Sequence, residues 1–353
     1  MTIEITRKDI PESEKDRNEI CRLFQSIESD KKIEISNPRA VLTFLRNLQG
    51  IIESSADLQF DESPSPLLQT KQIVEMCDIK DLYENAAMPE EEENMSGSLK
   101  DLSQRWIEYI QKSKTLCENK GLFNRDGFYP FYTKQNPRIL FVGREACWMK
   151  GKNYITTVCP CIMKDDFNKW TVNQYPFHRR QFYIAYGIIN FFSKGEFPNW
   201  DNVPWASEMA KNIFGRVNGE LTGTLDSISW AFINLSKFSN ETNDYQTDYV
   251  NRYWPFVNDE QNRVYLREQI DILRPQLIVC ANVNDLVKIL GYGKCDDSVA
   301  DCFYYSPQNG YPPFLDCYHF SALKSDRDGF YVPIGEMLKR HEDEIQQYLL
   351  KRP

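Results

Sequence analysis

Four short apolar runs, each closed by polar residues, constrain the fold of this chain more than any other feature of its sequence. Buried parallel strands read as continuous apolar runs, and the stretches between these four have the spacing of amphipathic helices, as crossover connections require. We therefore predict an open three-layer α/β/α domain with a four-stranded parallel sheet. The runs are RILFVG (138–143), SWAFIN (229–234), QLIVCAN (276–282) and FLDCYH (314–319).

The residues before this pattern have helical spacing throughout. In NPRAVLTFLRNLQGII (37–52) the apolar residues recur on one helical face. The stretch MPEEEENMSGS (88–98) is charged and contains Gly and Ser, which is typical of a linker. We therefore expect an all-α N-terminal domain over residues 1–95 and the α/β domain over residues 96–353.

The excess negative charge is confined to the N-terminal region. Residues 1–100 hold 12 Lys/Arg and 21 Asp/Glu, which equals the whole net charge of −9, and the remaining residues hold 30 of each. An acidic average counts against broad, non-specific DNA binding, but a neutral domain can bind nucleic acid through a local basic patch. We expect the acidic helices to bind a protein partner or to shield a site.

The sequence carries no sign of a membrane or a metal. The start MTIEITRKDI lacks an apolar signal region, and the run YGIINFF (186–192) is far too short to span a bilayer, so we expect a cytoplasmic protein with no membrane partner. The ten cysteines are expected to be free thiols. A metal site formed by Cys147, Cys159 and Cys161 is the alternative, but their spacing matches no standard zinc or iron–sulfur signature, so we expect no metal. We also expect no cofactor.

Polar residues close three of the predicted strands. The first ends in Gly143, Arg144 and Glu145, the second in Asn234 and the fourth in His319. Each one alone is most simply an ordinary loop residue. Because ligands bind at the carboxyl ends of parallel strands, however, a carboxylate, an amide and an imidazole in these places favour one common site.

These strand-end motifs resemble those of the uracil-DNA glycosylase superfamily, over residues 100–345. GREA (143–146) is similar to its Gly-x-(Asp/Asn)-Pro motif, FINLSKF (232–238) to Leu-Leu-Asn-x-x-Leu-Thr, and HFSAL (319–323) to His-Pro-Ser-Pro-Leu. Ala146 and Phe320 stand where the family has proline, so strict uracil specificity is not carried over.

The resemblance implies an N-glycosylase that hydrolyses the bond between the sugar and a flipped-out base. In that reading Glu145 orients the water and stabilises the cationic sugar, while His319 stabilises the leaving base. Asn234 and Gly143 bind the edge of the base. Tyr154 or Trp148 supplies the aromatic platform beneath it.

The resemblance also implies contacts to a nucleic acid, expected to be DNA. Leu323 would be the wedge that fills the gap left by the flipped base, and an ordinary packed leucine is the alternative. The other residues expected at this interface are Arg144, Ser321, Lys324 and Arg327, and further basic candidates for phosphate contact are Lys150, Lys152, Arg179 and Arg180.

Two other functions compete with a glycosylase. One is a non-catalytic protein of the same fold that binds a nucleotide or nucleic acid. The other is a doubly wound enzyme with a nucleotide cofactor, which is disfavoured because FVGREACW (141–148) lacks the Gly-x-Gly-x-x-Gly turn and no Walker-type sequence occurs. The motifs leave open which base is bound, and whether it belongs to DNA, RNA or a free nucleotide.

Overall fold

The computed structural model describes residues 78–112, 123–147, 149, 151–167, 170–217, 220–222, 228–240 and 259–351. All of them belong to the second of two compact units, Pro64–Pro353. The helices expected before residue 78 lie outside the described residues, so an all-α domain in that part of the chain stays a prediction.

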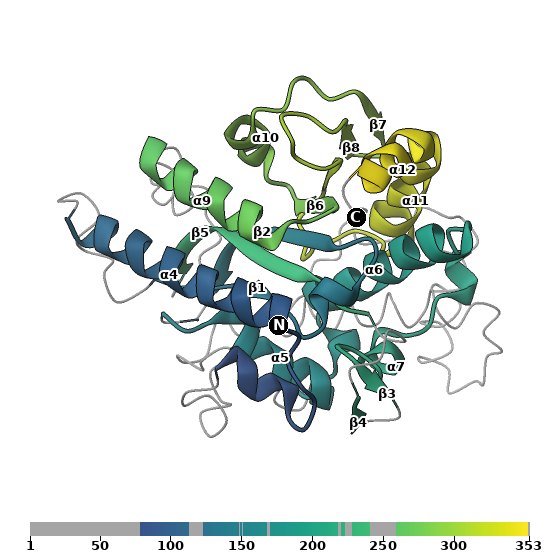
Figure 1. Cartoon of the computed structure of the whole chain (residues 1–353). Coiled ribbons are helices and arrows are strands. Elements are labelled where there is room, and N and C mark those ends of the chain that lie inside the picture. Colours follow the sequence, from purple (N-terminus) through teal and green to yellow (C-terminus); the bar gives the residue numbers. More distant parts are fainter. Residues whose placement is uncertain are drawn as a thin grey trace, which may run out of the picture. The chain divides into compact units, whose positions relative to one another are not determined.

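A mostly parallel sheet of seven strands, in the order β1-β5-β2-β6-β9-β8-β7, forms the centre of this unit (Figure 1). Strands β3 (Arg216–Val217) and β4 (Glu220–Leu221) form a separate two-stranded ribbon. The strands of the central sheet are β1 (Gly127–Phe128), β2 (Ile139–Cys147), β5 (Ala231–Asn240), β6 (Leu277–Ala281), β7 (Asp297–Val299), β8 (Cys302–Tyr305) and β9 (Phe314–Cys317).

The four predicted apolar runs form strands β5, β2, β6 and β9, which pair in parallel with one another in that order. The sheet is nevertheless wider than the four strands predicted, because β1, β8 and β7 add to its edges in antiparallel pairing. These edge strands have two to four residues each. Strands so short leave little apolar pattern in a sequence, which explains why they were missed.

Helices cover both faces of the sheet, and α4 and α9 lie side by side over one of them (Figure 1). Within the described ranges, no helix has both the length and the apolar character needed to cross a bilayer. The α-helices are α4 (Glu90–Lys112), α5 (Tyr154–Lys164), α6 (Pro176–Lys194), α7 (Ala206–Ala210), α9 (Glu260–Leu273), α10 (Asn284–Leu290), α11 (Val332–Arg340) and α12 (Glu342–Lys351). Single-turn helices are η2 (Ile79–Tyr83), η4 (Tyr132–Lys134), η5 (Val172–Gln174), η6 (Trp200–Asn202) and the π-helical η7 (Arg327–Tyr331).

The two faces of the sheet are separated by the alternation of its side chains. Phe141 and Phe232 belong to the core shared with α5, α6, α7 and α11. Val142 and Ile233, one residue further along each strand, belong to the core shared with α4, α9 and α10. Since successive residues of a strand point to opposite faces, the register of β2 and β5 is fixed by both cores at once.

The segment expected to be a linker, residues 88–98, is instead the start of helix α4. Met95 of this helix is buried in the core, and the carboxylate of Glu92 accepts hydrogen bonds from the backbone N–H groups of Phe131 (3.0 Å) and Thr133 (2.7 Å). Glutamates in the first turn of a helix also interact favourably with its dipole. The acidic run therefore starts a helix that belongs to the α/β unit.

The first helices described after β2, α5 and α6, pack on one face of the sheet, and the next helix described after β5, α9, packs on the other. Open α/β sheets bind ligands beyond the carboxyl ends of their parallel strands. A ligand site is therefore expected towards the carboxyl ends of the parallel strands, including β2 and β5.

Candidate functional site

Gly143 and Asn234 lie directly opposite each other on β2 and β5, just beyond the last residue of β2 that pairs with β6. Both strands continue past them, to Cys147 and Asn240, so these two residues do not end their strands as predicted. A Cβ atom placed on Gly143 would lie 2.6 Å from Oδ1 of Asn234 and 3.0 Å from Cζ of Phe232. Real Cβ atoms do not come so close to their neighbours. A larger residue at position 143 would therefore displace the side-chain amide of Asn234, which lies across the backbone of β2.

The side-chain amide of Asn234 is buried, with 2% of the residue exposed, and neither its nitrogen nor its oxygen has a hydrogen-bond partner among the described residues. The backbone N–H of the same residue donates to the carboxylate of Asp126 at 2.8 Å. A buried polar group without a partner is costly, and in native structures it indicates a bound water, a ligand or a catalytic role. The described residues therefore leave both hydrogen-bonding atoms of this amide unsatisfied.

Aromatic rings connect Asn234 with His319. The half-buried ring of Phe177, in the first turn of α6, lies 5.8 Å from the ring of Phe232 and 5.7 Å from the imidazole of His319. Phe232 precedes Asn234 by two residues and faces the same side of the sheet. We call Gly143, Phe177, Asn234 and His319 the strand-end site.

The imidazole of His319 is neutral, and one of its ring nitrogens accepts a hydrogen bond. Burial, together with the charges of Arg144 and Arg180, lowers its pKa to about 4. The backbone N–H of Ser321 donates to Nδ1 of the ring at 3.2 Å, so Nδ1 carries no proton. The proton of the neutral ring must then be on Nε2, which makes Nε2 a hydrogen-bond donor.

The loop after His319 is held by hydrogen bonds from the buried side chain of Arg180. The guanidinium of Arg180 donates to the backbone carbonyls of Phe320, Ala322 (2.8 Å) and Lys324 (2.7 Å), and its Nε donates to Asp326 at 2.7 Å. At the tip of this loop Leu323 is 72% exposed. It is therefore not an ordinary packed leucine.

The other residues predicted for the site lie in different surroundings. Glu145 pairs in register with Ser236, one step beyond Gly143 and Asn234, and is partly exposed. Arg144 lies close enough to His319 to lower its pKa, and Ser321 is exposed on the loop. The predicted residues Trp148 and Lys150 lie outside the described residues.

Two basic residues of the same predicted interface have local partners. The ammonium group of Lys324 lies 4.5 Å from the centre of the Tyr318 ring. Exposed Arg327 pairs with Asp328 at 3.5 Å. Both side chains are on the surface of the segment that follows His319.

Two expectations for individual side chains are wrong. Arg179 and Arg180 were expected to contact phosphates, but both are buried and form ion pairs of 2.7 Å with Asp326, so they are not available to a nucleic acid. The buried ring of Tyr154 stacks on Phe232 at 4.5 Å, within the core. A half-buried ring, Phe177, is the better candidate for an aromatic platform.

Phe177 and Asp126 were not predicted from the sequence, and Arg180 was predicted with a different role. The sequence signal for Phe177 is YPFHRR (175–180). Its proline stands at the first helical position and marks the start of α6, so Phe177 lies in the first turn of that helix. Asp126 carries no such signal, because its partners Asn234, Lys237 and Gln269 are more than 100 residues away.

Among the described residues, no group of three His, Cys, Asp or Glu side chains is arranged to hold a metal ion. Cys147, Cys159 and Cys161 form no disulfide bond. No protein-family model matches this chain, and no curated protein matches its sequence at a significant level. Function therefore has to be inferred from the chemistry of the strand-end site.

Proposed function

We propose that the strand-end site binds a nucleobase, which makes this chain a nucleobase-recognising α/β protein. More specifically, we propose a base-excising N-glycosylase of the uracil-DNA glycosylase superfamily. The observation that carries the proposal is the amide of Asn234, which is buried on the parallel strand β5 and has no partner within the described part of the chain.

An asparagine amide suits one edge of a pyrimidine, because it offers a donor and an acceptor side by side. The half-buried ring of Phe177 is a surface on which a base can stack. A base in a duplex reaches such a pocket only after extrusion, which costs about a few kcal/mol. Exposed Leu323, at the tip of the loop held by Arg180, is suited to fill the gap left behind.

His319 would act on the leaving base. Breaking the N-glycosidic bond leaves negative charge on the base, and a donor aimed at a base oxygen stabilises that charge as it develops. A neutral imidazole that carries its proton on Nε2 can donate this hydrogen bond without first becoming protonated.

Glu145 would act on the sugar and the water. The sugar becomes cationic as the bond breaks, and a carboxylate at the end of β2 can stabilise it and orient a water for attack. The imidazole follows β9, two strands away from β2 in the order β2-β6-β9. Strands two apart are separated by about 10 Å, which is on the scale of one nucleotide.

The proposal is tested by an excision assay on single- and double-stranded substrates that carry uracil, hypoxanthine, xanthine or mismatched bases, developed with alkali. Release of a base by the wild-type protein, with altered selectivity in Asn234→Ala, supports a glycosylase. Binding without release of any base would instead support a non-catalytic nucleotide- or nucleic-acid-binding protein. Absence of both binding and release would remove the nucleobase proposal.

A further inference from the structure

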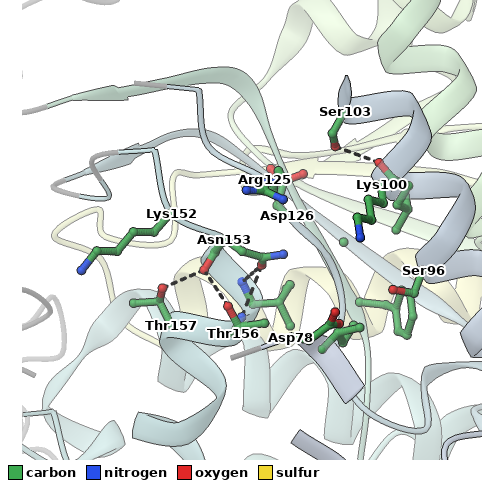
Figure 2. Close-up of a pocket in the computed structure, with 15 residues that line it drawn as sticks. Asp78, Ser96, Lys100, Ser103, Arg125, Asp126, Lys152, Asn153, Thr156 and Thr157 are labelled. Carbon is green, nitrogen blue, oxygen red and sulfur yellow. Dashed lines mark hydrogen bonds between the residues drawn. The ribbon is translucent and has the colours of Figure 1, made fainter. Parts of the chain in front are cut away.

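A pocket of about 380 Å³ lies between α4, β1 and the start of α5 (Figure 2). It shares no residue with the strand-end site. We call it the edge pocket. Its lining residues are Asp78, Ile79, Ser96, Leu99, Lys100, Ser103, Arg125, Asp126, Gly127, Phe128, Lys152, Asn153, Ile155, Thr156 and Thr157.

The edge pocket has an excess of positive charge in an acidic protein. Three of its residues are cationic and two are carboxylates, but Asp126 is neutralised by Lys237, whose ammonium lies 2.7 and 2.8 Å from its two oxygens. The second carboxylate, Asp78, caps helix η2 by accepting from the backbone N–H of Lys80. Asp78 is therefore the one carboxylate of the lining that is not neutralised by Lys237, against the two cations Lys100 and Arg125.

Lys100 and Arg125 approach the pocket from different elements. Figure 2 shows Lys100 extending from α4 towards the start of α5, and Arg125 beside Asp126, whereas Lys152 extends away from both. Neither Lys100 nor Arg125 has an ion-pair partner in the part of the chain that the structure describes. Exposed cations on one pocket without carboxylate partners are suited to a multivalent anion.

The backbone at the start of α5 does not supply the anion site. Oδ1 of Asn153 accepts from the N–H groups of Ile155 (2.9 Å) and Thr156 (3.3 Å), and Tyr154 N–H donates to the Arg125 carbonyl at 2.7 Å. These amides are occupied. Binding of an anion would depend on the two cationic side chains, which makes it testable by substitution.

The floor of the edge pocket is apolar. Leu99, Phe128 and Ile155 line it and are buried in the core. Cations over an apolar floor fit a ligand that joins an anionic group to a less polar body. We propose that the edge pocket binds a phosphate group, carried either by a free nucleotide or by a nucleic-acid strand, through Lys100 and Arg125.

The test is calorimetric titration of the full chain with thymidine 5′-monophosphate, with thymidine, with inorganic phosphate and with a short single-stranded oligonucleotide. The variant Lys100→Gln/Arg125→Gln removes both cations. Lys211→Gln/Lys339→Gln is the matched control, since both of these lysines are exposed elsewhere on the surface. Unchanged melting temperatures establish that each protein is folded.

We expect the phosphate-bearing probes to bind at least about tenfold more weakly to the Lys100/Arg125 variant than to the wild type, with no change in the control. Binding should also weaken as salt increases. Binding of the mononucleotide identifies a free nucleotide as the source of the phosphate, and binding of the oligonucleotide alone identifies a strand. Equal affinities of the variant and the control, or no binding of any phosphate probe, would overturn the proposal.

The same titration in an Asn234→Ala background separates this proposal from the proposed function. Asn234→Ala disables the strand-end site and leaves Lys100 and Arg125 in place. Phosphate binding that persists in Asn234→Ala and is lost in Lys100→Gln/Arg125→Gln supports the edge pocket whether or not a base is excised. Loss of phosphate binding in Asn234→Ala would contradict a separate pocket.

Discussion

The backbone N–H of Asn234 donates a 2.8 Å hydrogen bond to the carboxylate of Asp126, which lies 108 residues earlier in the chain. The same carboxylate accepts from Lys237 at 2.7 Å and from Gln269 at 2.7 Å. On this side of β5 the pairing with β1 covers only Ala231 and Phe232. Asp126 therefore holds the part of β5 that presents Asn234.

Replacing Asp126 by asparagine should destabilise the protein strongly. The substitution keeps the size of the side chain but leaves the buried ammonium of Lys237 without a counter-charge, and burial already lowers the pKa of Lys237. We expect the free energy of unfolding to fall by about 3–5 kcal/mol in a urea titration. Asp101→Asn, on the exposed side of α4, should change it by less than about 0.5 kcal/mol. Similar losses in both variants would contradict a role for this ion pair.

Gly143→Ala tests the close approach of β2 to the Asn234 amide. The added Cβ would displace that amide or the ring of Phe232, so we expect a loss of about 1–3 kcal/mol of stability and a loss of nucleobase binding. Gly97→Ala is the control, because a Cβ at this position of α4 meets nothing within 4 Å. It should stabilise the protein by up to about 1 kcal/mol. Full retention of base binding in Gly143→Ala would show that the amide is not the recognition element.

The stability of the protein should depend on pH through His319. Its pKa falls from an ordinary value of 6.5 to about 4 on folding, so the unfolded state binds more protons between these values. Stability is thus complete above about pH 6.5 and is lost as the pH falls towards 4, by up to about 1.4 kcal/mol per pH unit. Denaturant titrations at several pH values should give a smaller slope for His319→Gln than for the wild type. Identical slopes would mean that the imidazole is not desolvated.

Arg180→Lys should loosen the loop that carries Leu323. A lysine cannot reach Asp326 and three backbone carbonyls at once, because its donors are on a single atom. We expect the amide hydrogen of Ala322, which donates to the carbonyl of His319 at 2.7 Å, to exchange at least about tenfold faster. Arg327→Lys, an exposed change in the next segment, should leave this rate unaltered. Unchanged exchange in Arg180→Lys would show that other contacts hold the loop.

The parallel strands were the part of the fold that could be predicted from the sequence. Runs such as QLIVCAN are buried on both faces, so the core alone determines their residue types. The linker prediction failed because a run of glutamates reads as solvated, whereas Glu92 is paired with donors from a distant segment. The local sequence does not show which residues contact Glu92, because one of them, Thr133, is about 40 positions away.

The placement of three candidate residues follows from the parallel sheet. Gly143 and Asn234 pair on neighbouring parallel strands and His319 follows a third, so the topology brings them to one end of the sheet, although β2 and β5 run further than predicted. The network of Asp126, Lys237 and Gln269 has no local pattern, since each member joins a different element. The role of Arg180 was also hidden, because a surface arginine and one buried against Asp326 look alike in a sequence.

The central proposal, base excision with His319 as the donor to the leaving base, is tested most directly by single-turnover base release from a saturated substrate by the wild type and His319→Ala. We predict release by the wild type and a rate lower by about two to three orders of magnitude in His319→Ala, with little change in substrate affinity, because this donor acts mainly as charge develops. Equal rates in the two proteins, or no release by the wild type from a substrate that it binds, would contradict this account.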